Sequence, residues 1–394
     1  MRPLGVGVIG YGFIGKVHSH AHRSIPLLYN PVPVETQLIG VCTRSEASGA
    51  TAIRQAGFRK WFATPEELLA SPDIDIIHIC TPNREHASAI RLAIAAGKHI
   101  YCDKPLALNS EEAAELAAMD SEVPAARQMT FNYRFVPALM RARQLCKQGY
   151  LGKLFQFRVA YLHAGYVDPK RPYSWRTNFE LSGGGAVADL GAHIIDITRY
   201  LIGPDTCVER GGEFESIRAD LQTLITERPD PVTGKMRKVD VDDIALLQCR
   251  LQGGATGTLE ASRLATGAQD ELRVELHGSA GSLRFNLMDP NWLDAYDATL
   301  PEAALGGDRG YTRIECTTRY PAPYSLGATK NSVGWLNFHI HSLYDFLNNV
   351  AHVESTGFSV LAEGSPGFED GLAVQRVIEA SLNSSRDGNW VQIK

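Results

Sequence analysis

The sequence predicts a protein of the α/β class, with a doubly wound parallel sheet in its first third and an α+β domain with a largely antiparallel open sheet in the remainder. A chain of 394 residues is longer than one hydrophobic core usually supports. Strand and helix patterns alternate up to residue 132, and β-branched and aromatic segments separated by glycine turns dominate thereafter. We therefore expect two domains, residues 1–132 and 133–394.

Composition excludes several classes of protein. With 44% hydrophobic and 21% charged residues the chain is typical of globular proteins, and its net charge of −5 argues against nucleic-acid binding. No apolar run approaches the ~18 residues of a membrane span, and we expect no signal peptide. The seven cysteines lack the spacing of a metal site or a disulfide framework. We expect a cytoplasmic protein with free thiols and no metal.

The first motif follows a short apolar strand within residues 4–19. Glycines at positions 10, 12 and 15 match GxGxxG, which allows a tight turn, close approach to a pyrophosphate and close packing of helix on strand. Alternating strands and helices then support a Rossmann dinucleotide-binding domain. The expected strands are 36–44, 74–82, 98–102 and 126–132, and the expected helices begin at Thr64 or span 84–96 and 110–119.

Polar residues follow three of these strands, in the tripeptides 81–83, 103–105 and 132–134. Ligands of doubly wound sheets bind at the carboxyl ends of the strands. Pro105 holds Lys104 out of helical conformation, which makes this lysine a candidate for chemistry as well as for an ordinary solvated side chain.

The stretch GGGAVADLGAHIID, residues 183–196, places three titratable side chains on one helical stripe behind three glycines. Asp189, His193 and Asp196 are spaced at i, i+4 and i+7, whereas apolar residues occupy another stripe. Two interpretations are open: a solvated helix face behind a flexible loop, or a set of catalytic groups.

The second domain is predicted from its strand patterns. We expect strands at 153–163, 242–251, 254–264, 270–278 and 281–287, joined as an antiparallel meander. Helices are expected at 336–350 and 368–384, and the last can pack back near the first domain. Residues 205–240 and 288–334, rich in proline and glycine, are expected to form loops.

Taken together, these motifs resemble the Gfo/Idh/MocA family, which includes glucose-fructose oxidoreductase and inositol dehydrogenases. The matching pieces are GVIGYGFIG, ICTPNREHASAIRLAIAAGKHIYCDKP, FNYRFVPAL, SGGGAVADLGAHIID and FEDGLAVQRVIEA. The resemblance implies catalytic roles for Lys104, Asp189 and His193. In such enzymes the histidine removes a hydroxyl proton, the aspartate orients that hydroxyl, and the lysine hydrogen-bonds the oxygen on which charge develops. Asp103 replaces the more frequent glutamate of the lysine motif.

The same resemblance implies binding residues. The segment 161–176 is similar to one that family members use to contact a sugar, and its Trp-Arg pair resembles members that act on pyranosides and anhydrosugars. The candidates in this segment are His163, Asp168, Trp175 and Arg176, and each of them is equally suited to anchoring a loop. The cofactor candidates are Gly10, Gly12, Phe13, Ile14, Gly15, Thr43, Arg44, Thr81, Pro82, Asn83, His86, Asp103 and Lys104. The substrate candidates are Tyr133, Arg134, His163, Asp168, Trp175, Arg176 and Asp196.

The expected function is NAD(P)-dependent oxidation of a secondary hydroxyl of a cyclic polyol, sugar or glycoside to a ketone, by a homodimer or homotetramer. Glycoside cleavage through a keto-sugar is an alternative. Another is a non-catalytic sugar-responsive regulator, although relatives of that kind tend to lack the lysine and histidine that this chain retains.

The coenzyme preference depends on the end of the second strand, where NAD-binding domains usually carry an acid. Thr43 and Arg44 stand there instead, which favours NADP slightly over NAD because a guanidinium suits a 2′-phosphate. The open alternatives are that Arg44 stacks over adenine, or that Glu35 or Glu46 reaches the ribose.

Overall fold

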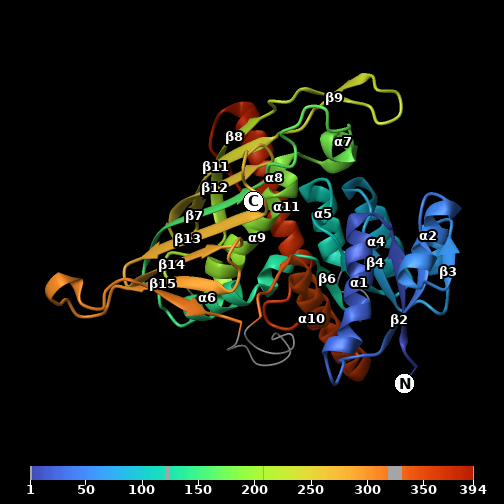
Figure 1. Ribbon diagram of the computed structural model, residues 1–394, viewed down its shortest axis with the longest axis horizontal. Coiled ribbons are helices and arrows are strands. Elements are labelled where there is room, and N and C mark those ends of the chain that lie inside the picture. The colour runs from blue at the N-terminus through green and yellow to red at the C-terminus, as the bar shows by residue number, and fades with distance from the viewer. Residues whose placement is uncertain (1, 120–123, 207, 318–330, 394) are drawn as a thin grey trace. The chain divides into compact units, whose positions relative to one another are not determined.

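The structure, a computed structural model, describes residues 2–119, 124–206, 208–317 and 331–393 (Figure 1). It consists of two compact units, Met1–Asn132 with Gly334–Gln375, and Tyr133–Val333 with Arg376–Lys394. The predicted α/β class, with a parallel sheet first and an α+β domain with a largely antiparallel sheet after it, is confirmed. The predicted second domain, residues 133–394, includes residues 334–375, but the contacts of these residues group them with the first unit.

The sheet of the first unit has six parallel strands in the order β3-β2-β1-β4-β5-β6. Val6, Val8 and Ile77 are fully buried, as expected of a parallel sheet covered by helices. The strands are β1 Leu4–Ile9, β2 Thr36–Cys42, β3 Lys60–Phe62, β4 Ile76–Ile79, β5 His99–Cys102 and β6 Arg127–Met129. The helices are α1 Phe13–Leu28, α2 Glu46–Ala56, α3 Pro65–Leu69, α4 His86–Ala95, α5 Ser110–Ala118 and α10 Trp335–Thr356.

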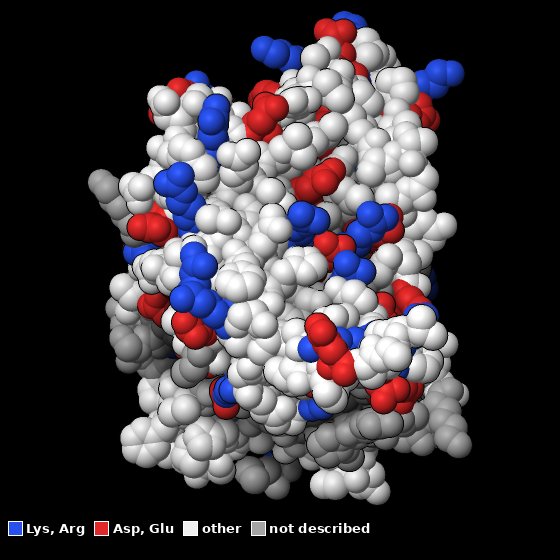
Figure 2. Space-filling model, turned by 90° about the vertical axis from the view of Figure 1, so that its left-hand side faces the viewer, with Lys and Arg blue, Asp and Glu red and all other residues white. Residues whose placement is uncertain are grey.

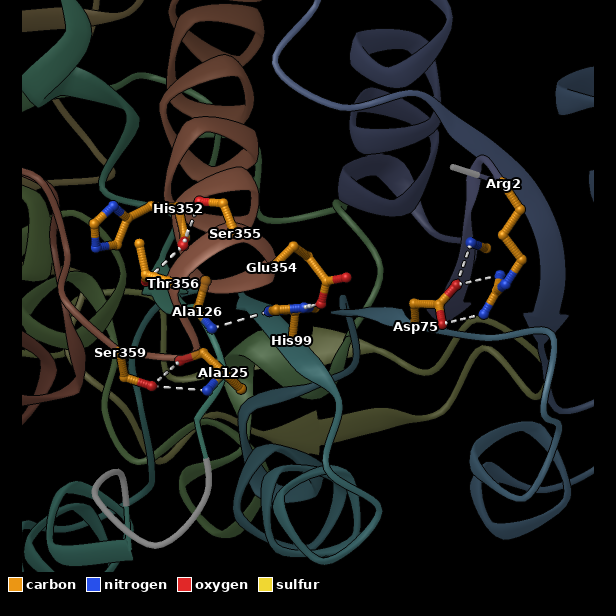
Figure 3. A network of polar contacts seen from close by, with 11 residues as sticks. Arg2, Asp75, His99, Ala125, Ala126, His352, Glu354, Ser355, Thr356 and Ser359 are labelled. Atoms are coloured by element: carbon orange, nitrogen blue, oxygen red, sulfur yellow. Dashed lines mark hydrogen bonds and ion pairs between the residues drawn. The ribbon is translucent and has the colours of Figure 1, made fainter.

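Helix α10 joins the first unit because it packs against α1. Figure 3 shows the polar contacts at its far end: His99 on β5 contacts Glu354 with 3.1 Å between Nε2 and Oε1, and the Ala126 amide donates to His99 Nδ1. Ser359 exchanges two hydrogen bonds with the backbone of Ala125. A segment from late in the chain thus completes the edge of the sheet at β5 and β6.

The second unit contains a nine-stranded sheet in the order β16-β15-β14-β13-β7-β12-β11-β8-β17. Its strands are β7 Leu154–Leu162, β8 Phe214–Gln222, β11 Ile244–Leu251, β12 Thr256–Ser262, β13 Glu271–Gly278, β14 Gly281–Asn286, β15 Trp292–Asp297, β16 Tyr311–Glu315 and β17 Val391–Gln392. A separate hairpin pairs β9 Glu227–Pro229 with β10 Met236–Lys238. The helices are α6 Pro137–Lys147, α7 Phe179–Ser182, α8 Ala186–Asp189, α9 Gly191–Ile202 and α11 Phe368–Asp387, whose first residues belong to the first unit.

Two predictions for this sheet are wrong. The strands do not form a simple meander, because β7 lies between β13 and β12 and runs parallel to β12. The described parts of the predicted loops 205–240 and 288–334 contain β8, β9, β10, β15 and β16, while residues 207 and 318–330 of these segments lie outside the described residues. Apart from Pro229 on β9, the described prolines and glycines of these segments lie between the strands, so they conceal the strand pattern when whole segments are averaged.

One face of the nine-stranded sheet carries α6 and α9, which contact β14, β15, β7 and β12. Strand residues that alternate with the buried ones bear charges, among them Arg158, Arg273 and Glu275. On the side of the molecule shown in Figure 2, Lys and Arg side chains are interspersed with Asp and Glu side chains. No helix among the described residues is long and apolar enough to cross a membrane.

Candidate active site

The glycine motif lies between β1 and α1 of the first unit, and its three glycines have different surroundings. Gly10 has φ +92°, and a Cβ there would lie 2.6 Å from the carbonyl oxygen of Cys80. A Cβ on Gly15 would lie 2.2 Å from the oxygen of Gly10, whereas one on Gly12 meets nothing within 4 Å. The turn is therefore closed on its inner side and open beside Gly12 at the N-terminus of α1, and this end of a helix attracts anionic groups.

Lys104 follows β5, and the surrounding backbone is held by Asp103. The Asp103 Oδ1 accepts hydrogen bonds from the Lys104 amide and the Thr130 hydroxyl, both at 2.9 Å. The Lys104–Pro105 peptide bond is cis. Asp103, a cofactor candidate, thus acts within the protein as the anchor of the lysine loop, and Thr130 is a partner that the sequence analysis missed.

His86, another cofactor candidate, is buried and braces two loops at the sheet edge. Its Nδ1 lies 2.7 Å from the oxygen of Pro105 and its Nε2 lies 3.1 Å from the oxygen of Thr81. Burial lowers the pKa of His86, and the Asp103 charge opposes that shift. The brace ties the loop after β4, which contains Pro82 and Asn83, to the loop that carries Lys104.

Thr43 and Arg44 follow β2 directly, and they differ in whether their polar atoms are already bound within the protein. The Thr43 hydroxyl donates to the oxygen of Ser45 and accepts from the Trp61 indole at 3.0 Å. Arg44 is exposed, and its guanidinium makes no hydrogen bond or ion pair within the described part of the chain. Ser45 caps α2 by accepting from the amide of Ser48.

In the second unit, the helix predicted over the GGG stretch is divided into α8 and α9 at Leu190. The glycines pass close to the chain before β11: a Cβ on Gly185 would lie 1.8 Å from the oxygen of Asp242. The buried Asp242 carboxylate accepts from the amides of Gly185 at 2.7 Å and Val187 at 2.8 Å. The side chain of Asp242, distant in sequence, thus caps α8. The only sign of this cap in the sequence is the pair of adjacent aspartates at 242–243.

The three side chains of the predicted polar stripe occupy different environments. Asp189 is about a quarter exposed and is bound by Arg263, with 3.0 Å between Oδ2 and Nη2. His193 is buried and lies edge-on to Tyr133, with 4.8 Å between ring centroids. Asp196 is buried in a pair with Arg134, whose Nε donates to Oδ2 at 3.0 Å. The interpretation as a solvated face is therefore wrong.

A network of hydroxyls and carboxylate lies beside His193. The Tyr161 hydroxyl donates to Asp270 Oδ1 and contacts the Tyr133 hydroxyl, and His163 Nε2 lies 3.0 Å from the same carboxylate oxygen. Burial raises the pKa of Tyr161, as do Tyr133 and Asp270. Burial alone would raise the pKa of Asp270. The hydrogen bonds from His163 and Tyr161 outweigh this effect, so the pKa of Asp270 is lowered. Sequence reasoning missed Tyr161 and Asp270.

The other substrate candidates lie in the segment after β7. Asp168 is exposed and accepts from the amide of Lys170 at 2.8 Å. The Arg176 guanidinium lies over the Trp175 ring, 4.3 Å from its centroid. Both are partly buried and begin a short 3-10 turn. Within the described residues, no group of three His, Cys, Asp or Glu side chains is arranged to hold a metal ion.

Comparison with known proteins matches both units to one family. Residues 4–130 match the model of an oxidoreductase family with an NAD-binding Rossmann fold, and residues 139–284 match the GFO/IDH/MocA C-terminal domain. The chain is 32% identical to levoglucosan dehydrogenase of Pseudarthrobacter phenanthrenivorans over 100% of this chain and 99% of that protein.

Solved structures agree over the same length. Levoglucosan dehydrogenase in complex with NADH and L-sorbose superposes with a TM-score of 0.90 at 32% identity, with 100% of both chains covered. An oxidoreductase domain protein from Kribbella flavida superposes with a TM-score of 0.89 at 34% identity, again over 100% of both chains. The chain therefore belongs to the Gfo/Idh/MocA family of NAD-binding oxidoreductases.

Proposed function

We propose that this protein is an NAD(P)-dependent dehydrogenase that oxidises a secondary hydroxyl of a sugar ring to a ketone, and that its substrate is a pyranose or a bicyclic anhydrosugar. The observation that carries the proposal is the presentation of Asp189 and His193 at the junction of α8 and α9, held by Asp242. The similarity over the full length to a levoglucosan dehydrogenase supports the substrate class.

The catalytic roles follow from the chemistry of the three groups. His193 accepts the hydroxyl proton, Asp189 orients the hydroxyl by accepting a hydrogen bond, and the Lys104 ammonium stabilises the oxygen as it gains negative charge. When bound, the coenzyme supplies the acceptor for the hydride. The burial of His193 against Tyr133 supports its role, because a base enclosed by rings holds one orientation.

For the coenzyme we propose contacts with the open side of the glycine turn and with the loop after β4. Gly12 supports this assignment because a Cβ there would face empty space. We assign His86 and Asp103 to support of these loops, since their polar atoms already bind protein groups. The proposed contacts are Gly10, Gly12, Phe13, Ile14, Gly15, Thr81, Pro82 and Asn83.

For the substrate we propose contacts with Tyr133, His163, Trp175 and Arg176. The stacking of Arg176 over Trp175 supports a preformed apolar wall with a charged rim, which is suited to a sugar ring. Arg134 and Asp196 bind each other, and Asp168 closes a turn. We assign these last residues to support of the site.

We further propose that Arg44 allows binding of NADP, with a modest preference over NAD. The exposed guanidinium beside the N-terminus of α2 supports this because both attract a phosphate. The levoglucosan dehydrogenase structure contains NADH, so the two coenzymes must be compared directly.

We also propose a homodimer or homotetramer in a reducing cytoplasm. The nine-stranded sheet has exposed strand residues, among them Arg158 and Arg273, and this open face supports packing against a second copy. The six described cysteines are all free thiols, which is usual in a reducing compartment. Light scattering that gives the mass of a monomer would contradict the assembly.

The test of function is reduction of NAD and NADP, followed by absorbance, with levoglucosan, L-sorbose, inositols, hexoses and glucosides. We expect turnover with at least one ring bearing a secondary hydroxyl. Tight coenzyme binding without turnover of any of these compounds would contradict the proposal and favour a regulatory role.

A further inference from the structure

Arg263, directly after β12, is a buried cation that binds the proposed catalytic carboxylate. Its side chain is 2% exposed, and Nη2 donates to Asp189 Oδ2 at 3.0 Å. Burying a guanidinium is costly unless carboxylates or carbonyls receive its hydrogen bonds. Burial alone would lower the pKa of Arg263, and the charges of Asp189 and Asp242, with Tyr166, raise it.

The same guanidinium reaches the segment that carries the substrate candidates. Nη1 donates to the carbonyl oxygen of Arg176 at 3.2 Å, and the group lies 4.8 Å from the centroid of the Tyr166 ring. The backbone of Arg263 accepts from the amide of Tyr166 and donates to the oxygen of Asp243. One residue therefore joins the Asp189 carboxylate, the Trp175–Thr177 turn and the loop after β7.

We propose that Arg263 is a positioning residue that keeps Asp189 ionised and oriented and couples its place to that of the proposed sugar-binding segment. This proposal rests on the proposed dehydrogenase function. Ionised Asp189 accepts the substrate hydroxyl's hydrogen bond, and its ion pair with Arg263 makes it a weaker base, which leaves proton removal to His193. A charge-assisted hydrogen bond is also directional, which restricts the carboxylate to one rotamer.

The charged and titratable groups around Arg263 come from several elements of the second unit. Asp189 lies on α8, Asp242 precedes β11, and Tyr166 follows β7. Arg228 on β9 also lies near the Tyr166 ring, at 5.3 Å, and it donates to the oxygens of Tyr166 and Asp168. His193 on α9 is the other titratable group that the second unit contributes to the proposed chemistry.

Arg228 provides a matched control because its side chain is also buried and holds the same loop, but within the described residues its hydrogen bonds go to backbone oxygens and not to Asp189. We expect Arg263→Gln to lower kcat at least tenfold and to move the acid limb of the kcat profile toward higher pH. Arg263→Lys should restore the position of that limb in part, because it returns the positive charge. Arg228→Gln should leave the limb where it is in the wild type.

A double-mutant cycle on urea unfolding tests the pair without activity. The variants are Arg263→Gln, Asp189→Asn and the double variant, and Arg263→Lys replaces the first if it does not fold. We expect the loss of stability caused by the Arg263 change to be smaller in the Asp189→Asn background. Additive losses would overturn the proposal even if no sugar is turned over. In an active enzyme, equal shifts of the acid limb for Arg263→Gln and Arg228→Gln would overturn it as well.

Discussion

Lys104 and His193 are the residues on which the proposed chemistry depends most directly. We expect Lys104→Ala and His193→Ala each to lower kcat by roughly two orders of magnitude or more, the usual cost of losing a placed acid–base or charge-stabilising group. Folding should be retained because the backbone near Lys104 is anchored by Asp103 and Thr130. Circular dichroism and coenzyme titration provide the control. Turnover close to that of the wild type in both variants would refute the assigned roles.

Arg44 is the residue that should set the coenzyme ratio. We expect Arg44→Ala to lower kcat/KM for NADP and to leave that for NAD nearly unchanged, because only NADP carries the 2′-phosphate. Arg54→Ala, at the other end of α2, is the matched control, since Arg54 contacts Thr51 on its own helix. A wild type that clearly prefers NAD, together with an equal effect of Arg44→Ala on both coenzymes, would rule out phosphate binding.

The junction of α8 and the GGG turn shows how one element depends on a residue elsewhere in the chain. Asp242→Ala removes the acceptor of two buried amides, and we expect a loss of roughly 3 kcal/mol in stability together with a lower kcat. The neighbouring Asp243 instead accepts from the amides of Leu224 and Ile225. Because Asp243 also accepts from two amides but does not cap α8, Asp243→Ala should lower stability by a similar amount and reduce kcat far less. If the two variants lost activity to the same extent, α8 would not depend specifically on its cap.

The sequence pattern predicted the helical stretch of α8 and α9. It did not predict the break at Leu190 or the partners of the side chains on these helices. The periodicity of residues 183–196 reports which faces are apolar, so it identified the helical stretch correctly. It carries no information on Arg263 or Asp242, whose contacts with this stretch span 74 and 57 positions. The strands β8 and β15 were missed for a related reason, because their turns lowered the local strand signal.

At the scale of the first unit, buried histidines should set its sensitivity to acid. His22 Nε2 lies 2.8 Å from His78 Nε2, and His78 Nδ1 lies 3.0 Å from His18 Nδ1. Burial lowers the pKa of His18 and of His22 to about 3 and that of His78 well below its usual value. The folded state therefore resists protonation that the unfolded state accepts below about pH 6.5.

The free energy of unfolding should thus fall as pH drops from about 6.5 toward 3, with a slope approaching about 1.4 kcal/mol per pH unit for each such histidine. His22→Gln should flatten this dependence in urea unfolding measured across that range. His20→Gln, on the same helix but exposed, should keep the slope of the wild type. Parallel curves for the wild type and the His22 variant would show that this cluster does not determine acid sensitivity.

The return of Gly334–Gln375 to the first unit has a consequence for how the protein is made. A ribosome delivers the glycine motif early and α10 only after the whole of Tyr133–Val333 has been synthesised. Until then, the faces of α1 and β5 that contact α10 and Glu354 are uncovered, and a nascent chain exposes them to water or to chaperones. A premature stop before residue 334 would therefore spare every residue of the glycine motif and still leave its unit unfinished.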